Sequence, residues 1–254
     1  MTAVTDNERG KRRMDHAGAR VGRPIPHPYL ARAGKLDQRG RLPAAFGNEI
    51  KGFSAEEHVS PDFWWTGDRE QDPWEWRELI ACSREVAYGK FFSKKAGFIS
   101  LEWLPRFANA RRDGYDFDSL YDEGLANARS KRIMDVFSDG DGGWKDDLIF
   151  STELKKLAGF GKEGAKNFPG IVTDLQMQLY LVVVDFKRRQ NKRGGEYGMP
   201  VSILLPPEAV WGYDAVTAAY GEAPEESARR IAKQIQKHWP SADEKAIWRM
   251  VGRR

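Results

Sequence analysis

The stretch Leu148–Pro206 constrains the fold most, because its apolar residues change from a helical to an extended spacing along it. Ser151 suits a helix N-cap and Gly159 suits a helix end, so a helix is predicted over Ser151–Ala158. The glycines of Phe160–Asn167 predict a turn after this helix. The first part of the stretch is therefore predicted to be a helix followed by a tight turn.

A second helix and a β-hairpin are predicted next. Pro169 suits the first turn of a helix, and apolar residues then recur every four positions, at Ile171, Leu175 and Leu179. Two apolar segments rich in strand-forming residues follow on either side of the polar turn Gln190–Glu196: Leu181–Phe186 and Val201–Leu205. Helix, turn, helix and hairpin in this order are typical of a winged helix. The predicted wing carries five cations: Lys187, Arg188, Arg189, Lys192 and Arg193.

A second β-hairpin is predicted earlier in the chain, from the apolar runs Val86–Phe92 and Ala96–Trp103. Further helices are predicted over Pro73–Ala81, Asp118–Phe137, Glu208–Ala219, Glu225–Trp239 and Ala242–Val251. Leu120, Leu125, Ile133, Met134 and Phe137 are the predicted core face of the long helix. We therefore expect an α+β fold, mainly helical, with a winged helix-turn-helix and a second small β-hairpin module.

The chain is predicted to have four segments. These are a basic, disordered arm and loop (1–45), an N-terminal aromatic-rich module of hairpin and helices (46–137), the winged helix (138–212) and C-terminal helices (213–254). The last segment includes a helix expected to start after Ser241 as its N-cap.

Composition excludes several classes of protein. The net charge of +4 is mild, but the positive charge is clustered in the predicted wing, which favours DNA as the partner. The single Cys82 and four scattered histidines predict neither a disulfide nor a zinc site, and we expect no metal and no cofactor. No apolar run reaches about 18 residues and no signal peptide is evident, so we expect no membrane partner and a cytoplasmic location. The oligomeric state is left open.

Tryptophans and carboxylates alternate over residues 61–77. Aromatic rings beside an acid and an arginine can stack on a base and hydrogen-bond its edge, so Trp65, Trp74 and Trp76 are candidates for base stacking. Glu75 is the candidate for positioning water, and Arg77 for contacting a phosphate or base edge. Such a pocket would need this segment to lie beside Glu102 and Arg106. The alternative, which we favour, is that the tryptophans fill a gap between two subdomains.

Several motifs resemble the AlkZ-related proteins: Tyr88–Phe92, Ala96–Pro105, Arg111–Phe117, Glu153–Lys155, Gly159–Gly161 and Leu175–Gln178. These proteins are similar to the winged-helix DNA glycosylases of the AlkZ type, which excise alkylated or crosslinked bases. The resemblance covers about Phe63 to Trp211 and implies N-glycosidic hydrolysis without a metal. Those glycosylases carry Gln-x-Gln or Gln-x-Asp early in the chain, whereas no such pair stands before Phe98 here.

Within the stretch that the resemblance covers, the one Gln-x-Gln is Gln176-Met177-Gln178, which falls in a predicted helix. Residues two apart on a helix are about 200° apart and cannot share a site, which favours amides that face solvent or bond the backbone. The candidate catalytic residues are Glu75, Gln176 and Gln178. The candidate DNA contacts are Arg77, Arg106, Arg111, Arg112, Lys162, Lys166, Arg188, Arg189, Lys192 and Arg193.

Two functions remain open at this point. The first is a DNA-binding winged-helix protein that resembles DNA glycosylases and excises alkylated or crosslinked bases. The alternative is a non-catalytic winged-helix protein that acts as a DNA-binding regulator or as a protein-interaction module. A regulator would expose a recognition helix with its polar residues outward, whereas a glycosylase needs a pocket in which acids and tryptophans converge. Whether the protein is an enzyme is therefore left open.

Overall fold

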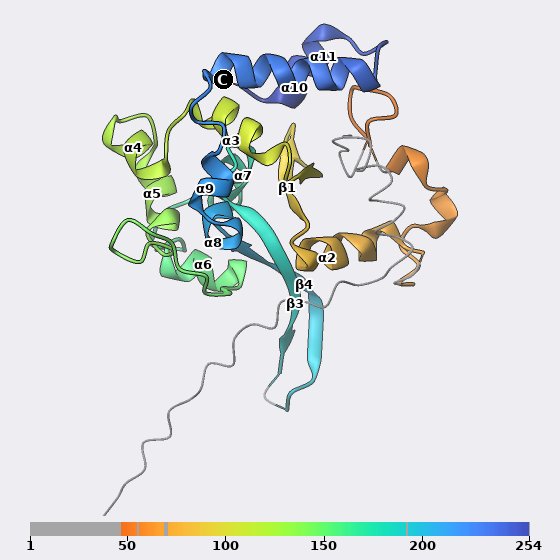
Figure 1. Ribbon diagram of the computed structural model, residues 1–254. Helices are drawn as coiled ribbons and strands as arrows, with labels where there is room; N and C mark the ends of the chain where they lie inside the picture. The colour runs from red at the N-terminus through yellow and green to blue at the C-terminus, as the bar shows by residue number, and fades with distance from the viewer. Residues whose placement is uncertain (1–46, 55, 69–70, 192, 254) are drawn as a thin grey trace, which may run out of the picture.

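A four-stranded antiparallel sheet in the order β2-β1-β3-β4 organises the fold (Figure 1). The structure describes residues 47–253, except for residues 55, 69, 70 and 192. In this computed structural model β1 (Val86–Phe92) pairs with β2 (Lys95–Ser100), and β3 (Val182–Gln190) pairs with β4 (Glu196–Leu205). Both hairpins predicted from the sequence are therefore confirmed.

The two hairpins share one sheet through a short junction. Tyr88 on β1 pairs with Val183 on β3, and both side chains are buried. Gly89, the next residue, lies so close to helix α7 (Phe168–Met177) that an added Cβ would stand 3.1 Å from Gln176 Oε1. The predicted division of the chain at 137 and 212 stays a prediction, and the predicted arm (1–45) lies outside the described residues.

Hairpin β3–β4 projects away from the helices (Figure 1). Its inner end, Val182–Val184, is buried, whereas the described residues of its outer half, from Lys187 to Met199, are exposed. At the tip, Asn191 Oδ1 accepts hydrogen bonds from the backbone N–H groups of Arg193 and Gly195, at 2.9 and 3.0 Å. An Asn side chain that bonds its own turn in this way favours a tight reversal of the chain.

The predicted helix at Pro73 is confirmed as α2 (Pro73–Ser83). Asp72 caps it: its buried carboxylate accepts from Trp74 N at 2.8 Å and from Gly67 N at 3.0 Å. Helix α2 packs against β1 and β3, so it lies beside the base of the projecting hairpin (Figure 1). Two short 3₁₀ helices precede it: η1 (Glu56–His58) and η2 (Pro61–Phe63).

The prediction of one long helix over Asp118–Phe137 was wrong. The structure has two short helices instead: α4 (Phe117–Asp122) and α5 (Ala128–Met134). Gly124 adopts a left-handed φ of 72°, which ends the first helix, and Asn127 caps the second through its side chain. Leu125 therefore lies in the connection and is 56% exposed, although it was a predicted core residue.

The helix predicted over Glu208–Ala219 is also broken, because Gly212 has a φ of 86°. Two helices flank this glycine: α8 (Pro207–Trp211) and α9 (Tyr213–Thr217). The last two helices are present as predicted: α10 (Pro224–His238) and α11 (Glu244–Val251). Asp243, rather than Ser241, caps α11, since its carboxylate accepts from Ala246 N at 3.1 Å.

The predicted sequence helix, turn, helix and hairpin is present as α6 (Ser151–Leu157), α7, β3 and β4. The N-cap of α6 is Phe150 rather than Ser151. Helix α5 packs against both α6 and α7, and α6 packs against β4. Helix α3 (Leu104–Arg112) packs against α9, α10 and α11 on the other side of the molecule. Within the described residues, no helix has the length and apolar character needed to cross a bilayer.

Candidate nucleic-acid interface

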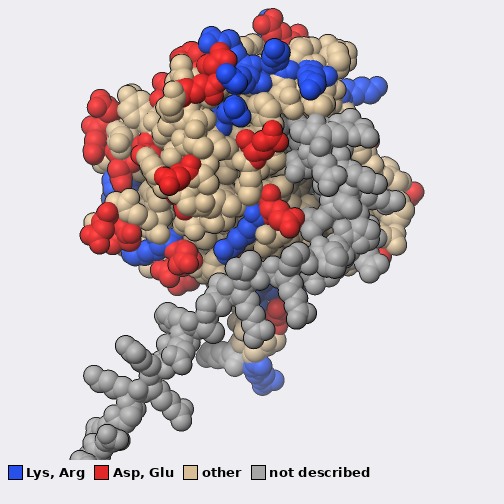
Figure 2. All heavy atoms as spheres, viewed as in Figure 1, with Lys and Arg blue, Asp and Glu red and all other residues tan. Residues whose placement is uncertain are grey.

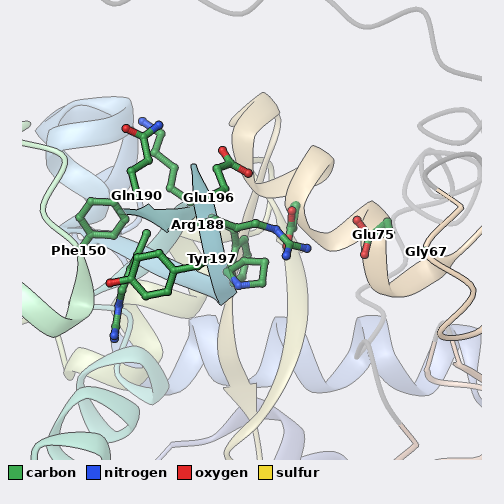
Figure 3. Close-up of a pocket in the computed structure, with 12 residues that line it drawn as sticks. Gly67, Glu75, Phe150, Arg188, Gln190, Glu196 and Tyr197 are labelled. Carbon is green, nitrogen blue, oxygen red and sulfur yellow. The ribbon is translucent and has the colours of Figure 1, made fainter. Parts of the chain in front are cut away.

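A groove of about 1050 Å³ lies where the projecting hairpin meets the body of the protein. Helix α2 and the segment before it supply Gly67, Glu75 and Glu78, and the hairpin supplies residues of β3 and β4. Figure 3 shows Glu75 on one side of the hairpin, with Phe150 and Tyr197 on the other. The groove therefore brings carboxylates, aromatic rings and the cations of the hairpin together.

The cations of the hairpin line this groove along consecutive positions of β3: Lys187, Arg188 and Arg189. The pairing with β4 shifts register between Lys187 and Arg189, so the regular alternation of side chains along a strand is interrupted at Arg188. Lys187 Nζ lies 3.3 Å from the Asp185 carboxylate, and Arg188 Nη1 donates to Gly198 O at 3.2 Å. Within the described chain, Arg189 and Arg193 have no ion-pair partner, and Lys192 lies outside the described residues.

A series of ring and guanidinium contacts, called the aromatic stack below, runs from the surface to the hairpin, and its two tryptophan rings are tilted by 43° to each other. The Trp65 and Trp74 rings lie with their centroids 4.4 Å apart, and Arg77 Cζ lies 3.3 Å from the centroid of Trp74. The same guanidinium carbon lies 4.8 Å from the ring of Phe186 on β3. Arg77 therefore joins α2 to the hairpin by cation–π contacts, and it also pairs with Glu78 at 3.3 Å.

The predicted stacking residues differ in their availability. Trp65 is 65% exposed at the outer end of the stack, and it has a left-handed φ of 66° that is uncommon for an aromatic residue. Trp74 and Trp76 on α2 are both half-buried. The structure thus brings Trp65 and Trp74 together with Arg77, and it leaves the exposed Trp65 ring as the accessible face of the stack.

The glutamine pair has a structural use in this protein. Gln176 is buried on α7; its Oε1 accepts from Lys90 N at 3.0 Å and its Nε2 donates to Val172 O at 3.3 Å. Gln178 Nε2 donates to Asp174 O at 3.0 Å. Neither residue lines the groove with Glu75. The two amides therefore bond the backbone, and Gln176 attaches α7 to β1.

Arg111 and Arg112 are buried, so they do not offer guanidinium groups to a phosphate. Arg111 donates three hydrogen bonds to backbone carbonyls, at 2.8 to 3.0 Å: those of Val251, Met250 and Met177. Arg112 pairs with Glu208 and also donates to Leu179 O. These contacts tie α3 to α7, α8 and α11. We therefore withdraw both arginines as candidate DNA contacts.

The remaining predicted contacts lie elsewhere. Glu102 and Arg106, which were expected to complete a pocket with Glu75, line a separate hollow beside α10. In the turn between α6 and α7, Lys162 is exposed, and Lys166 Nζ donates to Gly161 O at 2.9 Å. The structure therefore does not assemble the pocket that the sequence suggested from these parts.

Comparison with known proteins adds one finding. A family model described as AlkZ related matches residues 35–252, which is most of the chain. The chain belongs to this AlkZ-related family. Searches of curated proteins and of solved structures gave no match. The predicted family is thereby confirmed.

Sequence reasoning missed several residues of the groove in this AlkZ-related protein. Phe150, Phe186 and Tyr197 line it, and Tyr197 is 50% exposed on the strand opposite Arg189. Glu78 also lines it, one helical turn after Glu75. The spacing of Glu75 and Glu78 on α2 could have indicated Glu78, whereas the aromatic residues come together only through the pairing of distant segments.

The Cys82 thiol on α2 is hydrogen-bonded to β3. Cys82 Sγ donates to Asp185 Oδ1 at 2.8 Å. Burial of the sulfur, together with this hydrogen bond and the negative charge of Asp185, raises the pKa of Cys82 to about 12. A raised pKa favours the protonated thiol of Cys82 at neutral pH.

Proposed function

We propose that this protein binds duplex DNA through hairpin β3–β4, acting as the wing of a winged helix, and hydrolyses the N-glycosidic bond of a damaged base in the groove beside it. The observation that carries the proposal is the exposed row of cations Lys187, Arg188 and Arg189 in a groove with two carboxylates, whose wall at Phe186 contacts the aromatic stack through Arg77. Membership of the AlkZ-related family supports the same class of activity.

The burial of α7 favours contact through the wing over contact through a recognition helix. Six of its ten residues are buried: Phe168, Ile171, Val172, Thr173, Leu175 and Gln176. A helix that reads base edges in the major groove needs a polar face open to solvent. Helix α7 instead packs against α5 and β1. This burial is evidence against a regulator that reads sequence through α7, and it supports the proposal that the hairpin contacts the duplex.

The groove and the aromatic stack that reaches its wall at Phe186 together offer the residue types that base excision needs. An unstacked base can lie against the exposed ring of Trp65, which continues the stack formed with Trp74 and Arg77. In the proposed step, Glu75 takes a proton from water while the water oxygen bonds to the sugar carbon C1′. The bond from C1′ to the base breaks, and its electron pair goes to the base. An N-alkylated purine carries a positive charge, so it leaves as a neutral molecule.

DNA binding is tested with the variant Arg188→Ala/Arg189→Ala/Arg193→Ala. The plot of log affinity against log salt has a negative slope, and the loss of three phosphate contacts should make it less steep by about 2.7, at about 0.9 per contact. The control variant Arg188→Lys/Arg189→Lys/Arg193→Lys keeps the charge and should keep most of the slope. Fluorescence anisotropy with a labelled duplex at several salt concentrations measures both. An unchanged slope in the alanine variant would remove the hairpin from the interface.

Excision is tested with duplex DNA that carries alkylated purines, by cleaving the abasic sites that form. Glu75→Gln should lower the single-turnover rate about 100-fold or more, since a general base contributes about 10²–10⁴. Glu153→Gln on the exposed surface of α6, outside the groove, is the control and should keep the parent rate. Release of bases by Glu75→Gln as fast as by the parent would rule out the catalytic role of this carboxylate.

A second candidate is a non-catalytic protein that recognises damaged DNA. It is favoured by the two glutamines, whose amides bond the backbone and lie away from the groove. Such a protein would bind duplex with the salt dependence given above and would release no base from any alkylated or crosslinked substrate. The excision assay with the parent protein therefore separates the two candidates.

A further inference from the structure

A second groove, of about 780 Å³, lies between the start of α3 and the solvent face of α10. Its lining includes Trp103 and Glu226, and it contains five cations: Arg106, Arg229, Arg230, Lys233 and Lys237. Figure 2 shows lysines and arginines gathered over the region of α10, at the end of the molecule away from the projecting hairpin. The two cationic surfaces are therefore separate.

The cations of this groove follow from the amphipathic pattern of α10. Ile231 and Ile235 are fully buried against the body of the protein, so the opposite face of the helix points to solvent. Arg229, Lys233 and Lys237 recur every four residues on that face, which places successive cations about 6 Å apart along the helix. The apolar face is already covered, so α10 has no free apolar side to insert into a membrane.

Carboxylates neutralise part of this charge. Glu226 lies 3.0 Å from Arg229 and 3.1 Å from Arg230, and Glu222 lies 2.5 Å from Arg230 and 3.7 Å from Arg106. Five cations against these two carboxylates leave three positive charges in excess. Lys233 and Lys237 have no ion-pair partner among the described residues. The excess therefore lies toward the C-terminal half of α10 and is available to an anionic ligand.

Trp103 gives the cationic groove an aromatic wall, which a site for a simple anion does not need. Its ring is half-buried in the wall, and Arg106 Cζ lies 5.6 Å from the ring centroid. The indole N–H is buried and has no hydrogen-bond acceptor within the described part of the chain. A cationic groove with an aromatic wall is the arrangement by which proteins hold single-stranded nucleic acid, with phosphates on the cations and bases on the ring.

We propose that this groove binds a single strand of nucleic acid, with its phosphates along Arg229, Lys233 and Lys237 and a base against Trp103. The proposal goes beyond the function proposed above, because it needs neither the hairpin nor base excision. A protein with both surfaces would hold a duplex at the hairpin and a separate, unpaired segment at α10.

The test uses the hairpin variant Arg188→Ala/Arg189→Ala/Arg193→Ala as background, so that binding at α10 is measured alone. Added to it, Arg229→Ala/Lys233→Ala/Lys237→Ala should weaken binding of a labelled oligothymidylate about tenfold. The negative slope of log affinity against log salt should become less steep by about 2, at about 0.7 per phosphate. The control Arg229→Lys/Lys233→Arg/Lys237→Arg keeps the charges and should bind like the background. All three positions lie on the surface, so thermal unfolding should be unchanged.

The contribution of the ring is tested separately with Trp103→Leu, which should weaken oligothymidylate binding about tenfold with no change in salt slope. A duplex with the same number of phosphates should bind the background protein more weakly than the single strand does. Unchanged single-strand binding in the triple alanine variant, or an equal loss of duplex binding in it, would overturn the proposal. Displacement of the strand by vesicles rich in anionic lipid, at equal charge, would instead indicate a membrane site and would also overturn it.

The test of single-strand binding at α10 can fail or succeed independently of the test of duplex binding at the hairpin. If the proposed duplex contact is wrong, the hairpin variant binds duplex as the parent does, and the α10 variants still report on single-strand binding. If the α10 proposal is wrong, the hairpin variant still loses the duplex. Measuring both ligands with both variants therefore assigns a failure to one surface or to the other.

Discussion

Two pairs of adjacent arginines look alike in the sequence, but one pair is buried in the structure and the other is exposed. Arg111-Arg112 lies at the end of α3, and Arg188-Arg189 lies on β3. The first pair is 4% and 2% exposed, whereas both members of the second are exposed on the hairpin. A pair of adjacent arginines is therefore no indication of a nucleic-acid contact by itself, because the same guanidinium can satisfy backbone carbonyls within a fold.

The difference follows from what surrounds each pair. Helix α3 is covered by α9, α10 and α11, and the last carbonyls of α7 and α11 point at Arg111, which caps both helix ends. Among residues 47–253 that the structure describes, no element covers the outer half of the hairpin, and the side chains of Arg188 and Arg189 are exposed. Buried arginines should thus control stability and exposed arginines should control binding, and the free energy of unfolding can test this contrast.

The largest effect is expected for Arg112→Met, because Glu208 would be left as a buried charge without its partner. Breaking a buried ion pair in this way costs about 3–5 kcal/mol of unfolding free energy. Urea denaturation followed by far-ultraviolet circular dichroism measures the change. Arg112→Met combined with Glu208→Leu should recover much of the loss, and a single variant as stable as the parent would contradict the structural role.

A smaller loss is expected for Arg111→Lys, which keeps the charge but cannot reach all three carbonyls at once. Buried carbonyls without donors should cost about 1–3 kcal/mol. The same denaturation experiment measures the loss. Duplex affinity, measured where the variant is folded, should equal that of the parent, and a selective loss of affinity would return Arg111 to the DNA interface.

The smallest effect on stability is expected for Arg188→Ala/Arg189→Ala. Both side chains are exposed, and the hydrogen bond from Arg188 to Gly198 O lies at the surface, so unfolding free energy should change by no more than about 0.5 kcal/mol. The midpoint of urea denaturation checks this. A loss comparable to that of the Arg111 variant would mean that the hairpin depends on these arginines for its fold, and the contrast between the two pairs would fail.

The sequence predicted the elements of this fold well where its local signals were strong. Both hairpins and the helices that begin at Pro73 and near Pro169 are present, because capping residues, prolines and apolar spacing act within a few residues. Its errors came where a glycine interrupted an apolar pattern. Gly124 and Gly212 each adopt a left-handed backbone and divide a predicted helix into two.

The candidate site could be predicted only in part. Composition and spacing indicated Glu75, two tryptophans and the cations of the hairpin. The structure places Glu75 and the cations Lys187, Arg188 and Arg189 in one groove, and it brings Trp65 and Trp74 together in the aromatic stack. Phe150, Phe186 and Tyr197 were missed because they come from three separate segments. The expected neighbours of Glu75, Glu102 and Arg106, lie beside α10 instead. Contacts between distant segments depend on how the sheet and helices pack, and local sequence patterns do not predict that packing.

The sequence by itself determined the family, the order of helices and hairpins and the concentration of positive charge on the β3–β4 segment, because each of these depends on neighbouring residues. Only the tertiary structure decided which arginines face water, that Gln176 and Gln178 bond the backbone, and that a second cationic groove forms against Trp103. The physical reason is that burial and ion pairing depend on which distant elements cover a side chain, and that choice belongs to the whole fold.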